Sequence, residues 1–176
     1  MNERKLEQSV KLFLESLGED VCREGLRDTP SRFVSFFSSF TPRFCGSDDV
    51  LAKRVVKLFD EPSLVGKDQV VSVDGIPFFS LCEHHLMPFY GTVSVAYVPS
   101  EGKILGLSKF ARIVDYFGKK LQTQERFTEQ VATFLFKNIP CKWLKVIVVA
   151  QHMCMIARGA KALGSSTKTE SIKTLQ

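Results

Sequence analysis

Residues 82–99 read CEHHLMPFYGTVSVAYVP and combine a short turn with a strand-like segment. In the second half, Val93, Val95 and Tyr97 alternate with small or polar residues, which predicts a β-strand with one buried face. The first half places one cysteine and two adjacent histidines within a few residues of each other. The stretch therefore predicts a sheet with a metal-binding group in the turn that leads into one of its strands.

Segments on either side of this stretch favour the α+β class. Two apolar segments before it, residues 54–59 and 69–80, also read as strands. After it, a helix pair is expected at residues 107–121 and 123–139, with Thr123 as the N-cap of the second helix. The helix faces predicted to be buried comprise Phe110, Ile113, Val114 and Phe117, then Phe127, Val131, Phe134 and Leu135. Strands grouped around a helix pair are typical of α+β proteins.

The last apolar segment, residues 143–157, is rich in β-branched side chains and predicts a strand that is buried on both faces. On such a strand His152 and Cys154 would project from the same face, because they are two positions apart. From Gly159 onward the tail is polar, and we expect little fixed structure there unless a neighbour orders it.

The N-terminal part predicts a helical extension, residues 1–54, ahead of a catalytic domain of residues 55–176. Two helices are expected within residues 1–40, the second one capped by Thr29 with Pro30 at its first position. Their apolar stripes comprise Leu6, Val10, Phe13, Leu14 and Leu17, then Phe33, Phe36, Phe37 and Phe40. Residues 41–56 are the predicted linker.

The composition is that of a soluble globular protein, with 44% hydrophobic and 24% charged residues among 176. No apolar run approaches the roughly 20 residues that span a bilayer, and the start lacks a secretory signal, so we expect a cytoplasmic protein without a membrane segment. Five widely spaced cysteines favour reduced thiols over a disulfide framework. The net charge of +5 suits an anionic partner. The sequence lacks the clustered basic stripe that would predict nucleic-acid binding.

All three histidines of the chain lie within three residues of a cysteine. A Cys-x-x-His turn can supply two zinc ligands and a more distant cysteine the third. One prediction is an open site of Cys82, His85 and Cys154, which would activate a water and leave His84 and His152 as proton carriers. A closed site that adds His152 as a fourth ligand is the alternative, and spacing does not separate the two.

Four motifs, in the same order and at similar separations, resemble the GTP cyclohydrolase I family. They are CEHHLMPFYGTVSVAYVP, ILGLSKFARIVDYF, LQTQERFTEQVA and HMCMIARG, with a weaker counterpart in REGLRDTPSRF. The resemblance implies a tunnelling fold, in which an antiparallel sheet carries a helix pair on one face. It also implies a homodecamer with active sites at subunit boundaries, and conversion of GTP and water to 7,8-dihydroneopterin triphosphate and formate.

The resemblance also implies roles for individual residues. Zinc would be held by Cys82, His85 and Cys154, while His84 and His152 would move protons. The positions implied to bind substrate are Glu125 and Gln124 for guanine, Ser108, Lys109, Arg112 and Arg158 for the triphosphate, and Arg32 as a further contact. Two departures from the family pattern stand out: Ser35 replaces a usual lysine, and the sequence shows no final REEF-like helix.

Two other functions are compatible with the same fold. One is a non-catalytic subunit with a structural zinc, and the other is a related purine- or pterin-handling enzyme such as the nitrile reductase of the queuosine pathway. A structural zinc needs neither a free histidine pair nor Glu125, so the presence of His84, His152 and Glu125 favours catalysis. No nicotinamide-site signal supports the reductase.

Overall fold

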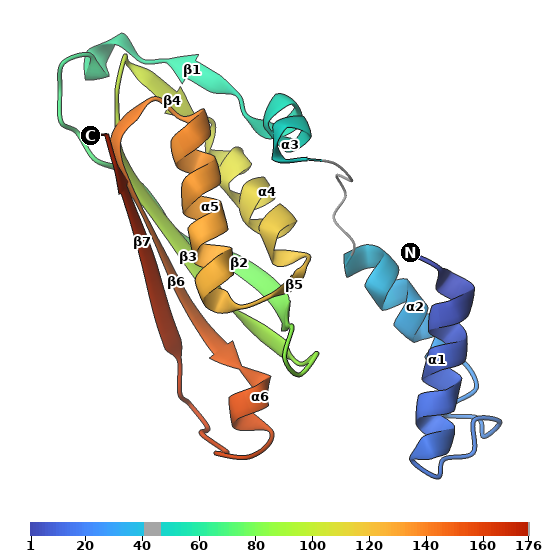
Figure 1. The fold of residues 1–176 in the computed structure, drawn as a ribbon. Helices are drawn as coiled ribbons and strands as arrows, with labels where there is room; N and C mark the ends of the chain where they lie inside the picture. Colours follow the sequence, from blue (N-terminus) through green and yellow to red (C-terminus); the bar gives the residue numbers. More distant parts are fainter. Residues whose placement is uncertain (41–46, 176) are drawn as a thin grey trace. The chain divides into compact units, whose positions relative to one another are not determined.

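A computed structural model describes residues 1–40 and 47–175 of the chain (Figure 1). The chain forms two compact units, Met1–Thr41 and Pro42–Gln176. The boundary after residue 54, between the predicted helical extension and the catalytic domain, stays a prediction. No helix among the described residues is both long and apolar enough to cross a membrane.

The N-terminal unit contains the two predicted helices. Helix α1 spans Glu3–Ser16 and helix α2 spans Thr29–Phe40. The side chain of Asn2 caps α1 by accepting a hydrogen bond from the backbone N–H of Lys5 at 3.0 Å. The predicted apolar stripe of α1 is only partly buried: Val10 is inside, whereas Phe13 remains 62% exposed within the chain.

Helix α3, Asp48–Val55, corrects two predictions. Residues 41–46 of the predicted linker lie outside the described residues, but residues 48–55 of it are helical. The strand predicted at residues 54–59 is shortened to β1, Leu58–Asp60. Acidic side chains in the first turn of α3 and basic ones in the last turn suit the helix dipole, and Leu51 and Val55 are buried on one face.

The larger unit is built on a five-stranded sheet with the order β5-β2-β3-β6-β7. Its strands are β2 (Val71–Cys82), β3 (Pro88–Pro99), β5 (Leu121–Gln122), β6 (Cys141–His152) and β7 (Thr167–Thr174). All pairs are antiparallel except the short β2–β5 pair. A separate small sheet pairs β1 with β4, Lys103–Leu105, and a single 3-10 turn at Pro62–Leu64 follows β1.

Helices α4, Leu107–Gly118, and α5, Gln124–Asn138, cover one face of the large sheet (Figure 1). The predicted strand face is confirmed, since Val93, Val95 and Tyr97 are fully buried. The residues of α4 and α5 that were predicted to face inward are all buried as well, and they belong to one hydrophobic core. The α+β class is therefore confirmed. Within the larger unit, no described helix covers the opposite face, which exposes Phe79, Tyr90, Val149 and Ile172.

The C-terminal third departs from the sequence-based prediction in two places. The predicted strand at residues 143–157 ends at His152, and Met153–Ile156 form the short helix α6. Strand β6 is also buried mainly on its helix-covered face, not on both. The tail that was expected to lack fixed structure contains β7, which pairs with β6 from Ala150↔Thr167 to Trp143↔Thr174. Its alternating exposure marks a two-faced edge strand.

Candidate metal centre and active site

The turn between β2 and β3 sets the positions of the two adjacent histidines. Cys82 is the last residue of β2, and its backbone N–H donates to the carbonyl of Met87 at 2.9 Å. The N–H of Leu86 donates back to the carbonyl of Cys82 at 2.8 Å, and Leu86 has a left-handed φ of 53°. The chain therefore reverses tightly at this point, and His84 and His85 lie exposed in the turn.

An ion pair fastens this turn to the start of α5. The guanidinium of Arg126 donates to the carboxylate of Glu83 and, at 2.8 Å, to the carbonyl of Leu121. The backbone N–H of Glu83 donates to the carbonyl of Gln122 at 3.0 Å. The hydrogen bond from Arg126 lowers the pKa of Glu83. The carboxylate therefore stays charged, and the ion pair stays formed, near neutral pH.

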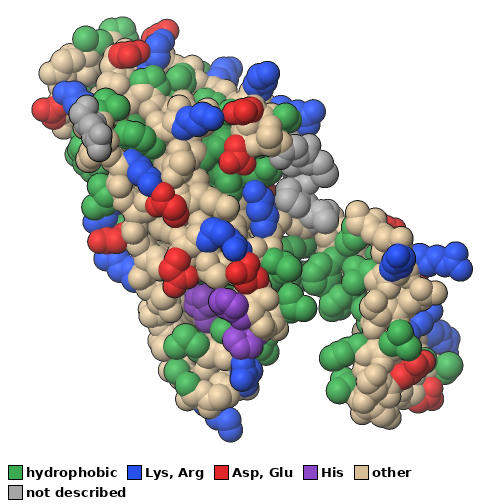
Figure 2. All heavy atoms as spheres, in the orientation of Figure 1, with side chains coloured by type: hydrophobic (Ala, Val, Ile, Leu, Met, Phe, Trp, Pro, Cys, Tyr) green, Lys and Arg blue, Asp and Glu red, His purple; other side chains and the backbone are tan. Residues whose placement is uncertain are grey.

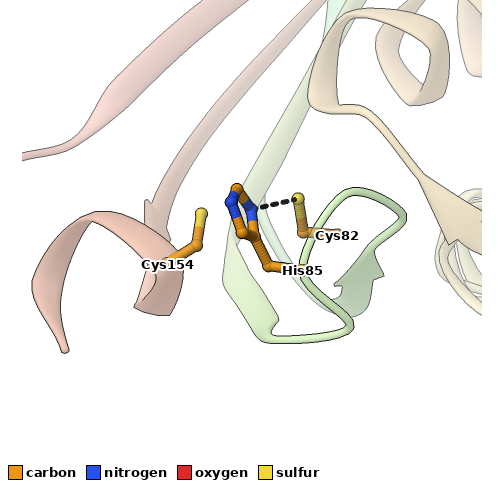
Figure 3. Close-up of side chains that lie close together, drawn as sticks. All are labelled: Cys82, His85 and Cys154. Atoms are coloured by element: carbon orange, nitrogen blue, oxygen red, sulfur yellow. Dashed lines mark hydrogen bonds between the residues drawn. The ribbon is translucent and has the colours of Figure 1, made fainter. Parts of the chain in front are cut away.

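Cys82, His85 and Cys154 form a group whose candidate ligand atoms all lie within 4.8 Å of one another. Figure 3 shows both sulfur atoms directed toward the imidazole of His85, with Cys154 supplied by α6 and the other two by the β2–β3 turn. The sulfur of Cys82 lies 3.9 Å from Nδ1 of His85. Among the described residues this metal-ligand group contains three members and does not include His152.

The chemistry and spacing of these three side chains fit zinc. A tetrahedral ion with Zn–S bonds of about 2.3 Å separates its ligand atoms by roughly 3.8 Å. Burial raises the pKa of Cys154, and the neighbouring Cys82 raises it further. A divalent cation between the two sulfur atoms would lower the pKa of both thiols, because its charge stabilises the thiolates. Two thiols and one imidazole are also a donor set that leaves a fourth position of a tetrahedral ion open.

The other two histidines lie beside this group in different surroundings. Nδ1 of His84 is 3.8 Å from the sulfur of Cys82, and the His84 ring is steeply inclined to that of His85. His152 ends β6, where its ring stacks on Phe89 with 4.8 Å between centroids and 7° between planes. Burial lowers the pKa of His152, and the charge of Glu125 opposes that effect. Both imidazoles therefore line the same cavity as the candidate metal group, and each has different contacts.

A cavity of about 230 Å³ connects these groups. Figure 2 shows the histidine side chains gathered on one face with acidic side chains next to them. The described residues that line the cavity are Cys82, His84, His85, Gln122, Thr123, Gln124, Glu125, His152, Cys154, Met155 and Thr167. Seven of them were predicted from the sequence. Gln122, Thr123, Met155 and Thr167 were not, because their residue types carry no chemical signal in a linear sequence.

The start of α5 presents one carboxylate to the cavity and keeps one amide inside the protein. Thr123 is the N-cap, as predicted, and its hydroxyl accepts from the N–H of Arg126 at 3.3 Å. Glu125 follows in the first turn and is exposed at the cavity wall. Gln124 is only 1% exposed, and its side chain is hydrogen-bonded within the protein. The two neighbours therefore differ in what they can offer a ligand.

The residues predicted to bind the triphosphate do not line this cavity. Ser108, Lys109 and Arg112 lie in the first turns of α4. Arg158 follows α6 and is exposed, and it is close enough to Cys154 for its charge to lower that pKa in part. Arg32 belongs to the N-terminal unit, where it pairs with Asp28 at 3.3 Å.

The described cysteines agree with the expectation of reduced thiols. Cys22, Cys82, Cys141 and Cys154 are all free, whereas Cys45 lies outside the described residues. Burial raises the pKa of Cys141 to about 11, which keeps this thiol protonated and unreactive. The two cysteines of the candidate centre are thus distinguished by their histidine neighbours.

An α+β scaffold that gathers two thiols, three imidazoles and a carboxylate around one cavity is the framework of a metal-dependent enzyme. The chain belongs to the GTP cyclohydrolase I family, whose model matches residues 6–175. The GTP cyclohydrolase 1 of Carboxydothermus hydrogenoformans is 40% identical over 173 residues, covering 98% of this chain and 86% of that protein. The GTP cyclohydrolase 1 of Streptococcus thermophilus (strain CNRZ 1066) is 45% identical over 172 residues, covering 98% and 88%.

A partial similarity to a solved structure is also found. The apo form of the archaeosine synthase QueF-Like matches with a TM-score of 0.47 and 18% sequence identity, over 58% of this chain and 91% of that chain.

Proposed function

We propose that this protein is a zinc-dependent GTP cyclohydrolase that converts GTP and water to 7,8-dihydroneopterin triphosphate and formate. The observation that carries the proposal is that the Cys82–His85–Cys154 group lines the same cavity as His84, His152 and Glu125. Family membership supports the same reaction, because the curated relatives are named for it. The tunnelling fold is proposed on the same ground.

Cys82, His85 and Cys154 would hold the zinc ion. When bound, zinc supplies Lewis-acid activation of water for attack on a carbon atom of the purine. The open three-ligand set is preferred to a closed one because His152 is held by other partners, Gln124 at its edge and Phe89 on its face.

His84 and His152 would move the protons that ring opening requires. Imidazole suits this task because its pKa lies near neutrality. We assign proton delivery at a nitrogen of the purine's imidazole ring to His84, and proton transfer near the ribose oxygen to His152. The two side chains reach the cavity from different elements, the β2–β3 turn and the end of β6, so they can serve different atoms of one substrate.

Glu125 would recognise guanine. A carboxylate accepts two hydrogen bonds side by side, which matches the ring N–H and the exocyclic amine of guanine. Its exposure at the cavity wall supports this role. Gln124 lies in the same substrate-binding segment at the start of α5.

The triphosphate would be held by Ser108, Lys109, Arg112 and Arg158, with Arg32 as a further contact. The three α4 residues lie outside the cavity of their own chain, which supports a site completed by a second copy. We therefore propose a homo-oligomer, a decamer by family membership, and a cytoplasmic location suited to a nucleotide substrate. Ser35 cannot replace a lysine charge, since its hydroxyl donates to the carbonyl of Ser31 at 3.0 Å.

The test is a turnover assay of the purified full chain with GTP, following formate and the fluorescent oxidised pterin, together with the zinc content. We expect equal amounts of formate and pterin. Glu125→Ala should raise KM for GTP about tenfold or more, because a charge-assisted hydrogen-bond pair is lost. Stoichiometric GTP binding with no formate release would contradict the proposal and indicate a non-catalytic subunit.

A further inference from the structure

Gln124 has an unusual position for a residue in a substrate-binding segment. It is 1% exposed, and its amide nitrogen donates to the carbonyls of Val148 at 3.1 Å and Thr167 at 2.9 Å. The same nitrogen lies 3.1 Å from the hydroxyl of Thr169. Its amide oxygen is 2.7 Å from Nε2 of His152. One side chain therefore joins β6, β7 and a proposed catalytic histidine.

The surroundings of Gln124 permit only one orientation of its amide. Three oxygen atoms, from Val148, Thr167 and Thr169, surround the nitrogen position. A flipped amide would direct its own oxygen at two carbonyl oxygens, which offer no donor. The amide oxygen must therefore face His152, and Nε2 of His152 must carry a hydrogen.

The hydroxyl groups of Thr128 on α5 and Thr169 on β7 link Gln124 to the tail strand. Thr128 donates to the carbonyl of Gln124 at 2.8 Å, so its hydroxyl must accept from Thr169, which lies 2.6 Å away. The Gln124 amide nitrogen lies 3.1 Å from the hydroxyl oxygen of Thr169, so its two hydrogens are shared among three oxygen atoms. Thr128 is 2% exposed, so water does not compete strongly for these bonds. The network is closed only while β7 is in place.

We infer that Gln124 is a positioning residue that fixes the tautomer and ring orientation of His152 and couples both to strand β7. Phe89 fixes the face of the imidazole and Gln124 fixes its edge, so together they leave the ring one orientation toward the cavity. This inference rests on the proposed function, in which His152 moves a proton, and it assigns the Gln124 side chain to His152 in place of guanine.

Steady-state kinetics of the full chain can separate these two roles. Gln124→Met keeps the volume and removes the polar atoms, and we expect kcat to fall roughly 10- to 100-fold, because small misplacements of a catalytic group have effects of that size. KM for GTP should stay within about threefold and the zinc content should stay unchanged, since Glu125 and the metal group are untouched. A higher KM at unchanged kcat, or no change at all, would overturn the inference.

Variants of β7 test the coupling without altering a cavity residue. Thr169→Val removes the hydroxyl that bridges Thr128 and Gln124, and kcat should fall about 3- to 10-fold, whereas Thr169→Ser should restore it. Thr174→Val makes the same change on the outward side of the same strand and should leave kcat unaltered. If Thr169→Val and Thr169→Ser have equal kcat, β7 does not position His152, even where Gln124→Met fails to fold.

Amide hydrogen exchange supplies a readout that does not depend on turnover. In Thr169→Val the amides of residues 167–174 should exchange faster than in Thr174→Val, because one of the hydrogen bonds that link β7 to α5 is lost. Unchanged exchange would contradict the coupling.

Failure of the proposed function and failure of this inference give different results. A wild-type chain that releases no formate would refute the proposed function. An active wild type with an unaffected Gln124→Met variant would refute only the positioning role.

Discussion

His84 and His85 are adjacent in the sequence, but the fold gives them different partners. His85 lies with both thiols of the candidate centre, whereas His84 approaches only Cys82. The tight reversal at Leu86 is the local cause, because it turns consecutive side chains in different directions. A pair of adjacent imidazoles can thus divide metal binding and proton transfer between them.

This division predicts different outcomes for the same substitution at neighbouring positions. His85→Ala should lower the zinc content well below one ion per subunit and abolish activity, because a ligand is lost. His84→Ala should keep the zinc and lower kcat by about 10²- to 10⁴-fold, the range for loss of a general acid or base. Measurements of zinc content and kcat on the same preparations decide whether each histidine is a metal ligand or a proton carrier. Equal zinc loss in both variants would show that His84 is also a ligand.

At the scale of elements, the polar inner face of β7 explains how this strand is held in place although its one apolar side chain, Ile172, lies on the exposed face. Thr169 bonds to Thr128 and Gln124, while Ser171 and Lys173 both donate to the carboxylate of Glu129. The backbone of β7 also pairs with β6 along eight residues. Strand β7 therefore docks on α5 through hydrogen bonds and charge, where the other strands use hydrophobic burial.

The docking of β7 should depend on pH. The bond from Lys173 lowers the pKa of Glu129 below its model-compound value of 4.5, with further help from Ser171 and Thr133. A lowered folded-state pKa means that the stabilisation is present above about pH 4.5 and is lost as the pH falls through the folded-state value. Glu129→Gln should therefore be less stable than the wild type at pH 7, by less than about 1 kcal/mol since the group is largely exposed.

Urea unfolding of both proteins at pH 7 and at pH values below 4 measures this effect. The difference between the midpoints should narrow as Glu129 of the wild type becomes protonated. Glu15→Gln on α1, in the other unit, is the control for the loss of one carboxylate outside the larger unit. A constant midpoint difference at all pH values would exclude the ionised carboxylate as the source of the stabilisation.

At the scale of the whole molecule, the candidate centre joins parts of the larger unit that are distant in sequence. Two candidate ligands come from the β2–β3 turn, and the third comes from α6. Helix α6 follows β6, which pairs with β3 on the side away from β2. A bound ion would therefore cross-link the ends of three strands. Metal binding to the folded state alone adds stability by mass action.

Removal of the metal should lower the thermal stability of the full chain. With zinc at about 100 times its Kd, the predicted increase in Tm over the chelator-treated protein is about 5–10 °C at fixed protein concentration. Cys154→Ser should show little response to zinc, whereas Cys22→Ser, which changes an exposed thiol of the N-terminal unit, should respond like the wild type. An equal zinc response in Cys154→Ser would rule out Cys154 as a ligand.

The parts of the fold that rest on hydrophobic periodicity were readable from the sequence. The buried faces of α4, α5 and β3 agree with prediction because the apolar faces of these elements pack together into one hydrophobic core. The predictions that failed concern short or polar segments and the apolar strand β6, whose second face is not covered by a described helix of the larger unit. Residues 48–55 form a helix supported by two buried side chains, and β7 is ordered by partners that a local pattern does not contain.

The candidate site divides in the same way. The sequence by itself indicated the residue types that we propose for the chemistry, because its three histidines lie close to cysteines at two places. Only the tertiary structure decided how they are used. Cys154 reaches the centre from a helix, not from the strand that spacing suggested, and Gln124 is recognised as the anchor of His152 only through bonds to β6 and β7. Direction and hydrogen bonding belong to three-dimensional contacts, which no residue type specifies alone.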